Sequence, residues 1–181
     1  MRAAHLDARW QPRANPAYGR GFGYLSGTGG ASTNAPVADR PAGYSAAETR
    51  RITWTTAPAA GATCGLFVQN IPWPQGMPGA VSILARSSRT TRVMVTPERT
   101  TGRPADTGTD LPAGVWTPVG RIFAALLTTV TTTTVTCYIA SSVGGAPVEV
   151  GDTLDLCGCL IIPDLTPAAP TPGPIVWPRP L

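Results

Sequence analysis

The sequence contains no lysine, little charge of either sign and a single histidine. All 14 basic residues are arginine, Asp and Glu together number 10, and charged residues make up only 13% of the 181 residues. The formal net charge of +4 is spread along the chain, and Arg50 and Arg51 form the only adjacent basic pair. Because no basic stripe is available to follow a phosphate backbone, we expect no nucleic acid partner.

Long apolar runs are also absent. No stretch of about 18 uninterrupted apolar residues occurs, which excludes a transmembrane helix. The first residues, MRAAHLDARWQPR, lack the apolar segment of a signal peptide. We therefore expect no membrane contact, and a protein that is made in a cytoplasm and stays there until assembly or lysis.

The residues that most catalytic sites need are scarce. His5 is the only histidine and lies near the N-terminus, so a nucleophile activated by histidine would depend on a loose end of the chain. No Gly-rich loop stands between a strand and a helix to cradle phosphate. We predict that the protein is not an enzyme and carries no cofactor.

Four aspartates are candidates for metal ligands or for an acid–base pair. Asp152 and Asp155 are three residues apart on an expected strand and so face opposite ways; we expect Asp152 in a turn and Asp155 bonded to backbone. Asp106 and Asp110 lie in an expected loop, but Ca²⁺ needs about 6–8 oxygen ligands in an ordered spacing. We predict no metal site, while a structural Ca²⁺ held with backbone carbonyls remains an alternative.

The four cysteines do not resemble a disulfide scaffold. Cys64 and Cys137 are widely spaced, and a reducing compartment would keep the thiols free. Cys157 and Cys159 are expected on one face of a strand, where they cannot easily close a disulfide and lack two further zinc ligands. We predict that all four pack as small buried hydrophobic residues.

What the chain has in quantity is Gly and Pro, 20 of each, together with Thr, Val and Ile. This composition and period-2 alternation favour strands over helices. We predict strands over 22–25, 49–56, 64–71, 80–86, 91–97, 115–126 (as a pair or one bent strand), 128–140, 147–150 and 151–162. Residues 87–90 are expected to form a tight hairpin turn, with loops over 26–43 and 98–114. The fold prediction is an all-β, antiparallel β-sandwich of the jelly-roll kind.

Irregular segments flank this body. Residues 1–20 are predicted to form an extended N-terminal arm, 21–162 the sandwich, and 163–181 a Pro-rich docking tail that favours polyproline II. An extended arm has no core of its own, so Trp10 and Trp177 are candidate anchors on a neighbouring subunit, and Tyr18 a candidate partner or glycan contact.

Tryptophans in the body divide into two groups. Trp54 and Trp116 follow strand patterns and are expected in the core. Trp73 lies between two prolines and is the better candidate for an exposed contact with a sugar or a partner subunit, although it would equally serve as a cap on the sandwich.

Four short motifs follow one another along the chain in a fixed order. Asn15-Pro16 is followed by a strand RITWTTAP (Arg51 to Pro58), by an AGVW turn (Ala113 to Trp116) and by a late GDTLD strand (Gly151 to Asp155). Over about residues 15–162 this order resembles the minor tail proteins of bacteriophages that infect actinobacteria, in which it belongs to a carbohydrate-binding-module-like, galactose-binding-like jelly roll.

The resemblance implies a structural protein of the virion, made in the host cytoplasm. It implies other virion proteins as partners, a homo-oligomer of trimeric or hexameric arrangement, and a host cell-surface glycan as a possible ligand. A minor tail protein is our first interpretation. A capsid decoration or head-fibre protein and a stand-alone carbohydrate-binding module are the alternatives.

Overall fold

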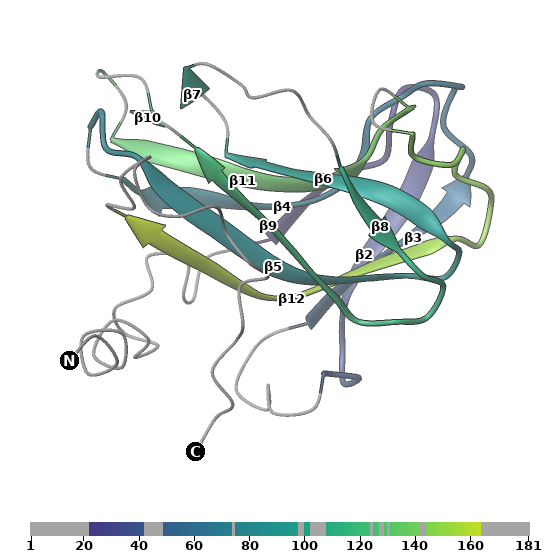
Figure 1. Ribbon diagram of the computed structural model, residues 1–181. Helices are drawn as coiled ribbons and strands as arrows, with labels where there is room; N and C mark the ends of the chain where they lie inside the picture. The colour runs from purple at the N-terminus through teal and green to yellow at the C-terminus, as the bar shows by residue number, and fades with distance from the viewer. Residues whose placement is uncertain are drawn as a thin grey trace.

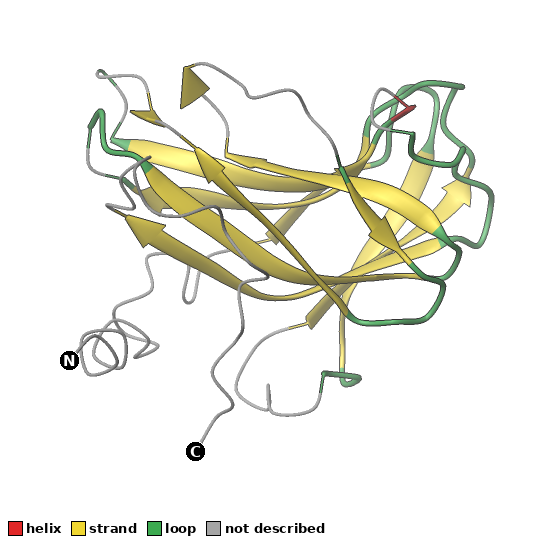
Figure 2. Cartoon of the chain, in the orientation of Figure 1, coloured by secondary structure: helices red, strands yellow, loops and turns green. Residues whose placement is uncertain are grey.

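The computed structural model describes residues 22–41, 49–73, 75–97, 100–101, 108–123, 125–126, 129, 131–141 and 144–163. Figure 1 shows two layers of strands, with β11 and β6 in one and β5 and β12 in the other. Figure 2 shows that loops join these strands. Within the described residues, no helix is long and apolar enough to cross a membrane.

The described residues form two five-stranded antiparallel sheets and one two-stranded sheet. Sheet I contains, in spatial order, β1 (Phe22–Leu25), β4 (Cys64–Pro72), β11 (Thr132–Ile139), β6 (Thr91–Pro97) and β8 (Thr109–Leu111). Sheet II contains β2 (Ala31–Val37), β3 (Thr49–Thr56), β12 (Thr153–Pro163), β5 (Gly79–Ser87) and β9 (Thr117–Phe123). β7 (Thr100–Thr101) pairs with β10 (Ala125–Leu126). The predicted all-β jelly-roll sandwich is confirmed.

Alternating side chains build the core between the sheets. On β3, Ile52 and Trp54 are fully buried while Thr53 and Thr55 reach the other side, as their period-2 pattern predicts. The Trp54 indole N–H donates to the Ser26 carbonyl at 3.0 Å, which satisfies its polar atom. Apolar residues of β4, β5, β6, β11 and β12 complete the same cluster.

Four segments differ from the prediction. The expected hairpin at 87–90 instead crosses between layers, because β5 belongs to sheet II and β6 to sheet I. β2, β7 and β8 form inside segments expected to be loops. Each pairs with one neighbouring strand, which holds its polar sequence in an extended conformation. The expected strand at 147–150 is wrong: Val148 packs into the core from a loop, and Val150 is exposed.

A β-bulge changes the phase of β12. The register against β5 shifts between Cys157 and Leu160, and Gly158 adopts a positive φ of 61°. Cys159 therefore joins the core with Leu154 and Leu156, whereas Cys157 does not. The expectation that the two thiols share one face is wrong for this reason.

The prediction of buried, free cysteines is confirmed for all four. Cys64, Cys137 and Cys159 belong to the core between the sheets, and Cys157 is buried outside it. Burial disfavours the thiolate, and it raises the pKa of Cys64 to about 11 and that of Cys159 to about 12. These thiols stay protonated and unreactive at neutral pH.

Candidate binding face on sheet I

Trp73 is not an exposed contact. Its side chain is 3% exposed, and its indole N–H donates to the Met77 carbonyl at 2.9 Å. The Trp73 backbone N–H bonds to the Thr131 carbonyl, which holds the ring against the end of the core after β4. The expectation of an exposed ring is wrong, and the ring acts as a cap. Trp10, Tyr18 and Trp177 lie outside the described residues.

Trp116 is not a core residue either. It lies half-buried just before β9, and the Arg86 guanidinium stacks over its ring at 4.5 Å from the centroid. Ala85 pairs with Thr117, so the next pair outward places Arg86 and Trp116 together on the outer face of sheet II. The strand pattern predicted burial correctly for Trp54, but Trp116 precedes its strand and follows the other face.

Asp155 forms an ion cluster on that same face, rather than the expected backbone hydrogen bond. Its carboxylate is 1% exposed and receives two hydrogen bonds from Arg51, at 2.6 and 2.8 Å. Arg86 donates at 2.6 Å and also pairs with Asp39. The hydrogen bonds that Arg51 donates to Asp155 raise the pKa of Arg51, and the cluster ties β3, β12 and β5 together.

Asp152 lies in a turn, as predicted. Its carboxylate accepts the Glu149 backbone N–H at 2.8 Å and pairs with Arg89. Asp110 pairs with Arg92 at 2.7 Å, and this hydrogen bond lowers the pKa of Asp110. Asp106 lies outside the described residues. Among the residues that are described, no three His, Cys, Asp or Glu side chains gather as metal ligands.

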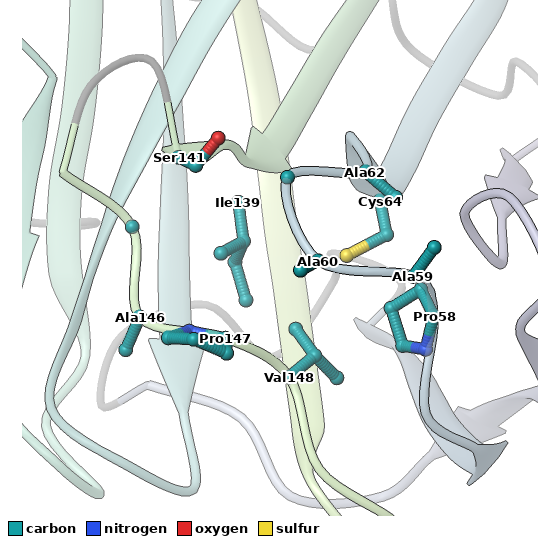
Figure 3. Close-up of a pocket in the computed structure, with 12 residues that line it drawn as sticks. Pro58, Ala59, Ala60, Ala62, Cys64, Ile139, Ser141, Ala146, Pro147 and Val148 are labelled. Atoms are coloured by element: carbon teal, nitrogen blue, oxygen red, sulfur yellow. The ribbon is translucent and has the colours of Figure 1, made fainter.

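One small pocket opens at the end of the sandwich, between the loops that follow β3 and β11 (Figure 3). Ile139, Val148 and Cys64 point into it, and Ser141 stands at its side (Figure 3). Its volume of about 40 Å³ is near that of one water molecule, far below the several hundred Å³ of an ordinary ligand pocket. The pocket is too small for a sugar ring.

The outer face of sheet I offers a larger surface. Leu66 and Val68 of β4, and Val135 and Cys137 of β11, point into the core. Side chains between them must therefore point outward. These outward residues form what we call the β4–β11 face, which comprises Phe67, Gln69, Asn70, Thr134, Thr136 and Tyr138.

Phe67 is the aromatic centre of this face. It is half-buried, pairs with Gly23 of β1 on one side and with Thr136 of β11 on the other. A Cβ added at Gly23 would overlap with the Phe67 ring, so the ring lies directly over the glycine. The missing side chain on β1 lets the half-buried Phe67 ring lie across the neighbouring strand.

Tyr138 and Met94 border the face as a separate apolar cluster. Tyr138 pairs with Met94 across β11 and β6, and its hydroxyl donates to the Met94 sulfur at 3.9 Å. Both side chains are less than 10% exposed, and Ala140 packs with them. This cluster forms a firm border rather than an open platform.

A second bulge supplies polar groups beside Phe67. The pairing of β4 with β11 shifts between Thr133 and Val135, and Asn70 has a φ of 57°. Gln69 and Asn70 are both exposed, since Val68 and Ile71 point into the core on either side of them. Bulges often re-aim side chains at functional sites. Each amide can both donate and accept hydrogen bonds.

The alternation of CGLFVQNI already places Phe67 and Gln69 opposite the core residues, so the sequence held a signal for this face. The prediction considered only tryptophan rings as sugar contacts and therefore did not include this face. The position of the Phe67 ring over Gly23 has no local signal, because it depends on which strand pairs beside β4.

No protein-family model and no curated protein matches the sequence. Solved structures do match the fold. The CBM22-1 xylan-binding domain of Paenibacillus barcinonensis Xyn10C aligns with a TM-score of 0.53 at 9% identity, over 82% of this chain and 90% of that domain. A CBM4 structure aligns with a TM-score of 0.50 at 11% identity, over 85% of this chain and 92% of that one.

A third match is the CBM22-1 and GH10 modules of Clostridium thermocellum xylanase 10B, complexed with xylohexaose, with a TM-score of 0.50 at 13% identity. It covers 82% of this chain and 26% of that one. The chain shares its jelly-roll fold with these carbohydrate-binding modules. The expected jelly roll of this kind is thereby confirmed, whereas the place of the chain among phage tail proteins stays a prediction.

Proposed function

We propose that this protein is a non-catalytic binding protein that holds a polysaccharide on the β4–β11 face. The observation that carries the proposal is the Phe67 ring, which lies over Gly23 on the same face as the exposed amides of Gln69 and Asn70. A flat ring packs against the C–H face of a pyranose, and the polar groups bond its hydroxyls.

The expected ligand is a neutral sugar chain. Within the described part of the β4–β11 face no side chain is charged, and on the neighbouring strands β6 and β8 of the same sheet Arg92 and Asp110 form an ion pair with no net charge. Catalysis has little support, since the sequence holds a single histidine, His5, and the described carboxylates pair with arginines.

The test is binding of the purified protein to a glycan array and to insoluble polysaccharides. The affinity of the Phe67→Ala variant is then measured for each glycan that binds the unaltered protein. We expect at least a tenfold loss of affinity, which corresponds to about 1.4 kcal/mol. Tyr24→Ala is the matched control, because Tyr24 is an exposed aromatic beside Gly23 on the same strand, and alternates with it. Unchanged affinity in Phe67→Ala, or no glycan retained by the unaltered protein, would overturn the proposal.

We further propose that this binding protein is a component of a phage virion, at the tail. The order of the motifs from Asn15-Pro16 to Gly151–Asp155 supports this placement. Antibodies raised against the purified chain and carrying gold should label tails. Label on heads would favour a capsid decoration or head-fibre protein, and virions without the chain would favour a stand-alone carbohydrate-binding module.

A further inference from the structure

The outer face of sheet II is buried where a two-layer sandwich is usually open to water. Leu84 lies between Ile83 and Ala85, which belong to the core, so its own side chain points away from the core. Leu84 is nevertheless only 5% exposed, and Cys157, its partner on β12, is 0% exposed. Outward side chains of an antiparallel sandwich are normally solvated, so neighbouring side chains or another part of the chain exclude water from this strip.

Two buried hydrogen-bond donors lie along the same strip. Ser82 is 2% exposed, and within the described part of the chain its hydroxyl has no hydrogen-bond partner. The indole N–H of Trp116 is likewise buried and has no partner among the described residues. Buried polar atoms are nearly always paired, so both sites call for an acceptor.

A described residue already covers one end of the strip, at Arg86. Asp39, from the connection between β2 and β3, reaches over the face to Arg86 at 2.6 Å. This contact accounts for the Arg86 end. It supplies no acceptor to Ser82, which lies four residues earlier on β5.

We propose that the Pro-rich segment 164–181 of the same chain docks along this strip of β5, from Ala80 through Ser82 and Leu84 to Trp116. β12 is the central strand of sheet II and runs directly into that segment, so the chain leaves the sheet beside the strip. Proline lacks the backbone N–H but keeps its carbonyl, so such a segment offers acceptors to the unpaired donors and demands none in return.

The dimensions permit this path. In polyproline II geometry residues 164–181 span roughly 55 Å, at about 3.1 Å per residue. β5 from Gly79 to Ser87 spans roughly 30 Å at about 3.3 Å per residue. The segment can therefore turn after Pro163 and run back along the whole strip. Recognition of extended Pro-rich segments by an aromatic ring and a few donors is a common mode in proteins.

The experiment places a thiol reporter under the expected cover. Ser82→Cys is made in the full chain together with a protease site between residues 163 and 164, so that the segment is released only after folding. Maleimide labelling at position 82, mapped by mass spectrometry, is expected to rise at least tenfold after cleavage and separation. Cys137, buried in the core, should stay unlabelled and so reports that the sandwich remains folded.

The matched control is a second full chain with the protease site after residue 20. Release of residues 1–20 should leave labelling at position 82 unchanged. Protection that survives removal of 164–181, or that is lost with residues 1–20 instead, overturns the proposal. Protection that disappears on dilution of the uncleaved protein also overturns it, because the cover would then come from a second copy.

Discussion

At the scale of single residues, Asp155 is the most tightly held charge in the described structure. One carboxylate that is 1% exposed joins Arg51 and Arg86 from two flanking strands. We expect Asp155→Asn to lower the free energy of unfolding by about 2 to 3 kcal/mol, somewhat less than a fully buried pair would lose, because both arginines reach solvent. Urea denaturation followed by tryptophan fluorescence measures this change.

Asp110→Asn is the control for that prediction. Asp110 also pairs with an arginine, but both partners are exposed, and exposed pairs contribute little. Its stability should be close to that of the unaltered protein. Equal losses in the two variants would contradict the role given to burial in the Asp155 cluster.

Gly23 offers a way to move the Phe67 ring without deleting it. A methyl group at Gly23 would strike the far end of the ring, which can rotate away. We expect Gly23→Ala to weaken glycan binding severalfold, because the ring leaves its position, while the midpoint of thermal unfolding shifts by only a few degrees. A binding loss that appears only with a large loss of stability would mean that Gly23 matters for the fold and not for the ring.

At the scale of elements, the bulge in β12 determines which thiol enters the core. Gly158 has a φ of 61°, a conformation that costs other residues about 1 to 2 kcal/mol. We expect Gly158→Ala to reduce the free energy of unfolding by that amount. Asn tolerates this conformation better, so Gly158→Asn should lose less in the same urea titration.

The elements also show what the sequence could and could not predict. β3 and β6 have the predicted bounds, because their alternating side chains carry the signal locally. The assignment of β5 and β6 to different sheets has no such signal, since a short turn serves a hairpin and a crossing between layers equally well. β2 was missed because its sequence ASTNAPV is half exposed and its strand conformation depends on β3.

In the candidate site too, features set by local sequence could be predicted and features set by strand pairing could not. The direction of Phe67 could be predicted from its neighbours along β4. The glycine beneath it, the threonine beside it and the bulge at Asn70 come from strands distant in sequence, and only the pairing register brings them together. Trp73 and Trp116 failed as predictions because ring exposure depends on what packs at the ends of strands.

At the scale of the whole molecule, buried thiols make the free energy of unfolding decrease at alkaline pH. The pKa of Cys64 is raised from 9.0 to about 11 by burial. Above pH 9 the unfolded chain releases this proton while the folded chain keeps it, so stability present below pH 9 is lost as pH rises toward 11. Unfolding titrations from pH 8 to 11 should show this decline, with a smaller slope in Cys64→Ala. An equal slope in both proteins would contradict the assignment.

The strand order has a further consequence for synthesis of the chain. β11 and β12 are the central strands of the two sheets and follow all the other described strands along the chain, so they leave the ribosome after them. Until they arrive, sheet I consists of two unconnected pairs, β1 with β4 and β6 with β8, and sheet II is divided in the same way. Nascent chains thus carry unpaired inner edges, which are the edges most prone to aggregation. An mRNA truncated before codon 163 would yield a fragment that aggregates through its unpaired strand edges instead of a smaller folded domain.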